Sequence, residues 1–211
     1  MHVIPSEVDR SPVSANWRRG LPVLTGARIR LRELRPSDAT PLMAMLTSAE
    51  ITRFISEPPT TLDGFERFIH WTLRQRAAGA HAGFVATLIG SDTPIGIFQV
   101  TEIQRDLEAA EWGFVLAASF WGTGLFHEGA QLLLDFAFNG VGIHRLEARA
   151  AVLNGRGNGA LLKLGAVQEG VLRQSFVRHG QAFDQVLYSI LDHDWRASRA
   201  AATRSFASRV H

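Results

Sequence analysis

Two adjoining segments decide how this chain folds: Glu111–Leu116, which reads EWGFVL, and Trp121–Gly124, which reads WGTG. The first is a mostly apolar run with the length and composition of a buried strand. The second holds two glycines of the kind that form a tight turn. A stretch with apolar residues at helical spacing follows and reaches Asn139. Together the segments predict a strand, a glycine turn and the N-terminus of a helix.

The predicted helix N-terminus has the chemistry of an anion-binding site. The first N–H groups of a helix have no intrahelical partner, and the helix dipole places partial positive charge there. Glycines at positions 122 and 124 would let a ligand approach the backbone closely. We therefore expect phosphate to bind at this turn without a metal ion, although two glycines before a helix can also serve simply as a tight turn.

Strands and helices are predicted to alternate along most of the chain. The strands expected from period-two patterns and their bounding turns are 27–34, 84–89, 95–103, 109–116, 145–152, and a hairpin of 171–177 and 183–191 that turns at His179-Gly180. The helices expected from caps and helical spacing begin at Pro36, at Thr60 or Thr61, at the glycine turn, and at Gly157. The second of these helices should end at Gly79 and the third at Asn139-Gly140.

This order of motifs resembles that of the GCN5-related N-acetyltransferase (GNAT) superfamily, specifically the branch that contains the ribosomal-protein N-terminal acetyltransferases. The matching motifs, in chain order, are Arg28–Leu34 with Pro36 and Asp38, Glu111–Phe114, Trp121–Gly124 with Glu128, Arg145–Ala148, Asn154, Lys163–Gly165 and Glu169–Arg173. The resemblance implies an α/β (α+β) fold whose central, mixed but mostly antiparallel, twisted sheet has about seven strands flanked by helices. The fourth and fifth strands would splay apart to form the cofactor cleft.

The resemblance also implies an activity and a cofactor. The chain would transfer the acetyl group of acetyl-CoA to a primary amine, either a protein N-terminus or a small molecule. The pantetheine arm would pair with Phe114, Val115 and Leu116 as an added strand does, and Asn154 would contact the same region. The residues expected around the diphosphate are Trp121, Gly122, Thr123, Gly124, Leu125, Phe126 and His127.

Glu111 is expected to act as the general base, directly or through water, because it occupies the position of the family's glutamate. Apolar neighbours such as Trp112 would raise its pKa by desolvation. The alternative is a solvated glutamate at a strand end, and Glu102 and Glu108 are further candidates for the base. Tyr188, the only tyrosine, could serve as a general acid, but packing within the last strand is its expected role.

Two departures from the family pattern leave a second function open. Phe126 stands where the family commonly has a small residue, and Gly157 stands where the branch usually has a serine that is a proposed acid for the departing thiolate. A catalytically weakened relative that binds acyl-CoA, as a sensor or interaction module, would also fit. Asn154 could likewise serve only as a helix cap.

The composition fits one α/β domain. Among the 211 residues there is no Cys, which excludes disulfides, a cysteine nucleophile and thiolate metal ligands. We expect a flexible N-terminal arm at 1–21, an acetyltransferase domain at 22–195 and a basic C-terminal tail at 196–211. The arm has no continuous apolar run, which indicates neither a signal peptide nor a membrane span, and a cytoplasmic location is expected.

The charge of the chain gives little support to nucleic-acid binding. The net charge is +2 and the pI about 9.9, because Lys163 is the only lysine and arginine keeps its charge at high pH. The arginines of the tail lack interleaved aromatic residues and a compact basic patch, so nucleic acid is a disfavoured partner. Monomer and homodimer both stay open, since an apolar strand edge near the C-terminus could pair with a second copy.

Overall fold

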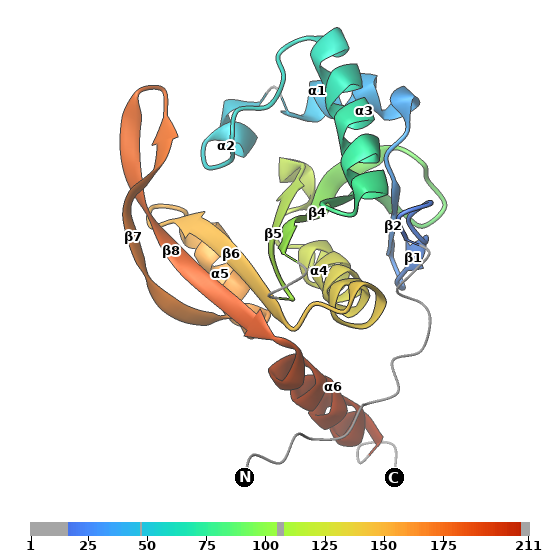
Figure 1. Cartoon of the computed structure of the whole chain (residues 1–211), viewed down its shortest axis with the longest axis vertical. Helices are drawn as coiled ribbons and strands as arrows, with labels where there is room; N and C mark the ends of the chain where they lie inside the picture. The colour runs from blue at the N-terminus through green and yellow to red at the C-terminus, as the bar shows by residue number, and fades with distance from the viewer. Residues whose placement is uncertain (1–16, 47, 105–107, 208–211) are drawn as a thin grey trace.

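The structure is a computed structural model that describes residues 17–46, 48–104 and 108–207. These residues form one eight-stranded sheet with helices packed against it (Figure 1). The strand order is β1-β2-β3-β4-β5-β6-β8-β7, and every neighbouring pair is antiparallel except β5 and β6. The predicted mixed, mostly antiparallel sheet is confirmed. Its additional strand is β1 (Leu24–Thr25), which has two residues and lies at the edge.

The longer strands follow the alternation expected from the sequence. They are β2 (Ile29–Glu33), β3 (Ala82–Leu88), β4 (Pro94–Gln104), β5 (Ala109–Leu116), β6 (Arg145–Ala151), β7 (Val167–Arg178) and β8 (Gln181–Leu191). On β5 the side chains of Ala110, Trp112 and Leu116 are buried against the same face of the sheet, because successive side chains of a strand point to opposite faces. β7 and β8 form the predicted hairpin, which turns at His179 and Gly180.

Helices cover both faces of the sheet and divide the core into two clusters. On one face lie α1 (Ala39–Leu46), α2 (Ala49–Thr52) and α3 (Leu62–Ala78), and on the other α4 (Leu125–Asp135) and α5 (Gly155–Lys163). The predicted ends of α3 are confirmed. The hydroxyl of Thr61 accepts the N–H of Gly64 at 3.1 Å, and Gly79 ends the helix with a φ of 78°, in the left-handed region that favours glycine.

The described residues at both ends of the chain contact the domain. Residues 1–16 of the expected N-terminal arm lie outside the described residues, but Trp17 is buried and packs edge-on against Phe136, with ring centroids 6.4 Å apart. The expected tail is helical through residue 207, because α6 (Asp192–Ala207) continues directly from β8. Trp195 anchors α6 by packing near Phe138 and by donating its indole N–H to Asp135 at 2.8 Å.

Within the described part of the chain, no helix combines the length and the apolar character needed to cross a membrane.

Candidate functional site

The pairing of β5 with β6 ends at Glu111. The two strands pair only at Ala109 with Arg145, Ala110 with Leu146 and Glu111 with Glu147. Beyond this point β5 remains paired with β4, and β6 with β8, but not with each other. Parallel strands that stop pairing leave the backbone groups on their facing edges without a strand partner. The divergence expected between the fourth and fifth family strands therefore lies between β5 and β6.

The backbone of β5 beyond Glu111 presents specific groups toward β6. Ala117 donates its N–H to Ile95 of β4 at 2.9 Å. Because successive residues of a strand direct their backbone groups to alternate sides, Phe114 and Leu116 face β6, whereas Val115 faces β4. The carbonyl of Leu116 already accepts the indole N–H of Trp121 at 2.9 Å. An added strand would therefore meet the N–H and C=O of Phe114 and the N–H of Leu116.

Glu111 has the environment of a proton acceptor. Its side chain is 28% exposed, and its Oε2 lies 3.3 Å from Nη1 of Arg149 on β6. Burial raises the pKa of Glu111 above its usual value; Arg149 lowers that pKa in part, and the nearby carboxylates of Glu102 and Glu147 raise it. A half-buried carboxylate with a raised pKa can take a proton from an amine more effectively than a fully solvated one.

The surface beside Glu111 is open. Gly113 follows two residues later on the same face of β5, where a Cβ would meet only the amide of Gln99, at 3.8 Å. A small group could therefore lie over the strand next to the Glu111 carboxylate. Glu102 and Glu108, the other candidate bases, have φ values of 51° and 46° and flank the β4–β5 connection.

The predicted glycine turn is present between β5 and α4. Gly122 and Gly124 have φ values of 75° and 84°, which glycine reaches without a Cβ penalty. The hydroxyl of Thr123 donates to the carbonyl of Phe120 at 2.7 Å and holds the turn together. The backbone N–H of Trp121 already donates to Ala118 at 3.1 Å, so Trp121 contributes its side chain, and not its amide, to this region.

The N-terminus of α4 follows the turn. The first i to i−4 hydrogen bond runs from Glu128 to Gly124 at 3.2 Å. Helix geometry therefore leaves the N–H groups of Leu125, Phe126 and His127 without intrahelical acceptors. The N–H of Leu125 donates to the hydroxyl oxygen of Thr123 at 3.4 Å, while Phe126 and His127 start the helix at its positive end.

The side chain of Phe126 packs beneath this turn. Its ring centroid lies 4.2 Å from that of Phe114 and 6.3 Å from that of Phe98. Gly129, one turn later, brings α4 close to the sheet, because a Cβ at this position would come within 2.8 Å of the Phe98 ring. The large residue at position 126 is therefore accommodated by the aromatic core.

The predicted asparagine caps α5. Asn154 accepts the N–H of Gly157 through Oδ1 at 2.9 Å, and a Cβ at position 157 would stand 2.5 Å from Asn154 Nδ2. Tyr188 is buried and donates its hydroxyl to Oδ1 of Asn158 at 3.0 Å, and burial raises its pKa. The local packing expected for Tyr188 is confirmed.

Two arginines near the glycine turn were not identified from the sequence. Arg28 of the β2 edge donates its backbone N–H and Nε to Glu128, at 2.8 and 3.1 Å, and its Nη1 to the carbonyl of Thr123 at 3.0 Å. Arg156, in the first turn of α5, lies with Cζ 3.7 Å from the centroid of the Trp121 ring. No local sequence pattern predicts either contact, because each contact joins segments far apart in the chain.

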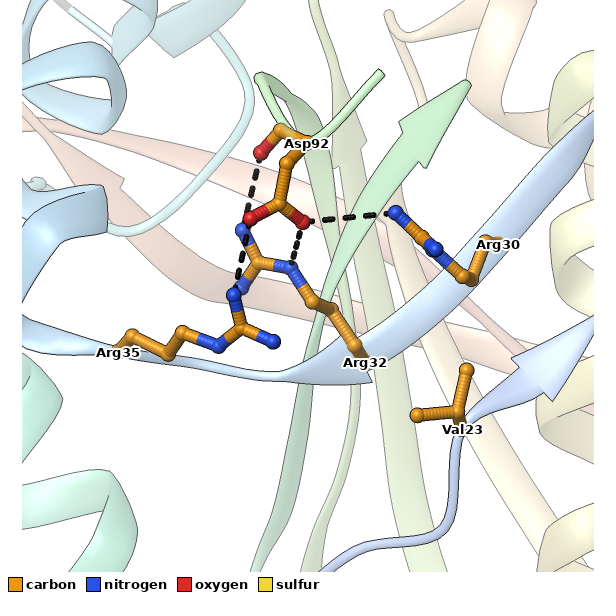
Figure 2. Close-up of a pocket in the computed structure, with 5 residues that line it drawn as sticks. All are labelled: Val23, Arg30, Arg32, Arg35 and Asp92. Atoms are coloured by element: carbon orange, nitrogen blue, oxygen red, sulfur yellow. Dashed lines mark hydrogen bonds and ion pairs between the residues drawn. The ribbon is translucent and has the colours of Figure 1, made fainter. Parts of the chain in front are cut away.

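A pocket near the β1–β2 edge of the sheet is explained by ion pairs. It has a volume of about 270 Å³ and is lined by Val23, Arg30, Arg32, Arg35 and Asp92 (Figure 2). The Asp92 carboxylate accepts from Nε of Arg32 at 2.7 Å and from Nη1 of Arg35 at 2.9 Å, and it lies 3.5 Å from Arg30. These ion pairs tie β2 to the β3–β4 turn, and the hydrogen bond from Arg32 lowers the pKa of Asp92.

The described residues include no group of three or more His, Cys, Asp or Glu side chains placed to hold a metal ion.

Known proteins resemble this chain in sequence and in fold. Residues 28–167 match the family model described as an acetyltransferase (GNAT) domain. The uncharacterized N-acetyltransferase YoaA of Bacillus subtilis (strain 168) is 27% identical over 184 residues, covering 81% of this chain and 97% of the relative. The putative ribosomal N-acetyltransferase YdaF of the same strain is 25% identical over 175 residues, covering 81% and 95%.

A further relative is named for a small-molecule acceptor, and a solved structure has a similar fold. The spermidine N(1)-acetyltransferase of Escherichia coli (strain K12) is 24% identical over 174 residues, covering 80% of this chain and 89% of the relative. The structure of Mycobacterium smegmatis RimJ in complex with CoA-disulfide superposes with a TM-score of 0.73 at 22% identity, covering 82% of this chain and 85% of that one. At this identity the superposition shows a shared fold.

Proposed function

The chain belongs to the GNAT family of acetyltransferases, and from this premise we propose that it transfers the acetyl group of acetyl-CoA to a primary amine by direct attack in a ternary complex. The acceptor is a protein N-terminus or a small-molecule amine. The observation that carries the proposal is the end of the β5–β6 ladder at Glu111. It places a half-buried carboxylate beside a free strand edge that leads to the N-terminus of α4.

The free edge of β5 would hold the pantetheine arm. The amide groups of pantetheine can pair with the N–H and C=O of Phe114 as an added strand would. The diphosphate would then lie at the glycine turn, against the backbone N–H groups of Gly122 to Gly124, Phe126 and His127 and the positive end of α4. The solved RimJ complex, which contains CoA-disulfide, supports CoA as the ligand of this fold.

The chemical step requires a neutral amine and an acceptor for its proton. The amine nitrogen attacks the thioester carbonyl carbon, the carbon–sulfur bond breaks, and CoA leaves as a thiolate. Glu111 takes the proton of the nitrogen, directly or through one water molecule. A thiolate is stable near neutral pH compared with an alkoxide, so CoA can leave without an acid from the protein, although a positioned acid would speed its departure. Tyr188 is not assigned that role, because its hydroxyl is buried and bonded to Asn158.

A catalytically weakened acyl-CoA-binding module remains the alternative. Gly157 favours it, because position 157 carries no hydroxyl that could protonate the thiolate. Phe126 does not favour it, because its ring packs against Phe114. A third function, nucleic-acid binding by the C-terminal arginines, is weakened further because Arg196 and Arg199 pair with Asp192 and Asp135.

Replacing Glu111 by Gln tests the catalytic assignment. We expect kcat/KM to fall by about 100-fold or more, because general-base catalysis contributes rate factors of this size, while CoA affinity stays the same. The matched control is Glu102→Gln, which removes a neighbouring carboxylate and should retain most of the activity. The acceptor panel should hold peptides with free N-termini and polyamines, since the named relatives include a putative ribosomal and a spermidine acetyltransferase.

Three results would change the proposal. Full turnover by Glu111→Gln would remove Glu111 from the mechanism. Loss of turnover in Glu102→Gln alone would transfer the role of base to Glu102. Tight CoA binding by the wild-type chain, without transfer to any amine of the panel, would favour the acyl-CoA-binding module.

A further inference from the structure

The glycine turn contains no cationic side chain for its expected ligand. Residues 112–144, which hold the end of β5, the turn and all of α4, include neither Arg nor Lys. CoA carries a diphosphate and a 3′-phosphate, and backbone N–H groups supply only partial charges to such an anion. A full positive charge near the turn must therefore come from another part of the chain. In the described structure two arginines reach the turn, Arg28 and Arg156.

Arg28 stabilises the turn through contacts with Glu128 and Thr123. Its Nε pairs with the carboxylate of Glu128 at 3.1 Å, and its Nη1 donates to the carbonyl of Thr123 at 3.0 Å. The Glu128 carboxylate also accepts the backbone N–H groups of Arg28 and Ile29, at 2.8 and 3.4 Å. The charge of Arg28 is thus balanced by an acidic partner, which makes it a poor source of attraction for phosphate.

Arg156 is exposed, and no carboxylate of the described residues pairs with it. It lies in the first turn of α5, a helix with no acidic residue in that turn. A cation at a helix N-terminus is repelled by the positive end of the helix dipole, and an arriving anion would relieve this repulsion. The positive charge of Arg156 and the positive end of the α5 dipole therefore favour the binding of an anion beside Arg156.

Trp121 gives Arg156 a fixed orientation. The guanidinium carbon lies 3.7 Å from the centroid of the indole ring, within the range of a cation–π contact. The indole is itself held by its hydrogen bond to Leu116 and by packing against both core clusters. A guanidinium stacked by its face keeps the N–H groups of its edge available for bidentate bonds to phosphate oxygens.

We propose that Arg156, oriented by Trp121, binds the diphosphate of CoA from the side opposite the N-terminus of α4. The diphosphate is preferred to the 3′-phosphate because Trp121 immediately precedes Gly122, in the same turn that presents the backbone N–H groups. Two helix N-termini, those of α4 and α5, then flank one anion. The inference rests on the proposed function, since it requires CoA to bind in the β5–β6 divergence.

The test is the affinity of Arg156→Gln for CoA and for dephospho-CoA, which lacks the 3′-phosphate, measured by titration calorimetry. We expect both affinities to fall by about 10-fold relative to wild type, because a hydrogen bond to a charged group contributes at this level. The dependence of affinity on salt should also become shallower, because one charge contact is lost. The matched control is Arg53→Gln, which removes a similar cation–π contact, with Phe54, from a different part of the fold.

Five outcomes would decide the inference. A loss of affinity for CoA but not for dephospho-CoA would assign Arg156 to the 3′-phosphate and overturn the proposal. Unchanged affinities, or a loss with an unchanged salt dependence, would leave Arg156 a packing role only. Wild-type protein that binds no CoA would overturn both the inference and the proposed function. The expected loss of CoA affinity in Arg156→Gln, together with a wild-type protein that transfers no acetyl group, would support the inference and contradict the proposed transfer.

Discussion

Acidification should destabilise the protein through one buried side chain, His81, which precedes β3. His81 is 3% exposed, and its ring centroid lies 5.1 Å from that of Trp71. Among the described residues, neither ring nitrogen of His81 has a hydrogen-bond partner. Burial therefore disfavours the charged imidazolium and lowers the pKa of His81 from 6.5 to about 4.

The sign and size of the effect follow from this shift in pKa. Below pH 6.5 the unfolded chain takes up a proton at His81 that the folded protein does not bind until the pH approaches 4, so stability falls as the pH decreases through this window. At about 1.4 kcal/mol per pKa unit, the full shift corresponds to about 3 kcal/mol. About 2 kcal/mol of this should be lost between pH 7.5 and pH 5.

Urea unfolding of the wild-type chain and of His81→Leu at these two pH values measures the effect. Leucine fills a similar volume and does not titrate, so the free energy of unfolding of the wild type should fall by about 2 kcal/mol more than that of the variant. All other titrating groups are present in both proteins and cancel in the comparison. His70→Leu, at an exposed position of α3, should show the wild-type loss. Equal losses in wild type and His81→Leu would refute the reasoning.

The candidate site yields three more expected outcomes. Arg149→Gln removes the cation that lowers the pKa of Glu111, so the acid limb of the kcat/KM profile should move to higher pH, and an unmoved limb would mean that another group controls it. Asn154→Ala removes the cap of α5 and should lower the free energy of unfolding by about 1 kcal/mol in urea titrations. Phe126→Ala should cost about 2 kcal/mol of stability by leaving a cavity beside Phe114, and CoA titration should show an affinity close to wild type if Phe126 serves the core.

Elements with strong local signals were predictable from the sequence alone. The bounds of β5 were expected at about 109 to 116 and are Ala109–Leu116, because its apolar run is short and is followed directly by turn residues. The start of α3 at Thr61 and its end at Gly79 follow from cap chemistry that a few residues determine. In such elements the local preference and the final structure agree.

Other elements depend on distant contacts and could not be predicted in this way. The composition of residues 196–207 is that of a charged, solvated tail. In the structure these residues belong to α6, which packs near Phe138 through Trp195. Trp17 lies in a segment rich in polar residues, and its burial depends on Phe136, more than a hundred positions along the chain. The helix that begins at Leu125 ends as a π-helical segment, Phe136–Val141, where both of these contacts converge.

The candidate site likewise has one part that local sequence predicts and another that depends on distant contacts. The N–H groups at the start of α4 come from adjacent residues, so a short motif is enough to predict where an anion would bind. The side chains that surround those groups come from elsewhere: Arg28, which precedes β2, reaches Thr123, and Arg156 of α5 reaches Trp121. Only the folded sheet, with β5 and β6 diverging after Glu111, brings these segments together. A mutation of Arg28 or of Arg156 could therefore change cofactor affinity while the glycine motif itself stays intact.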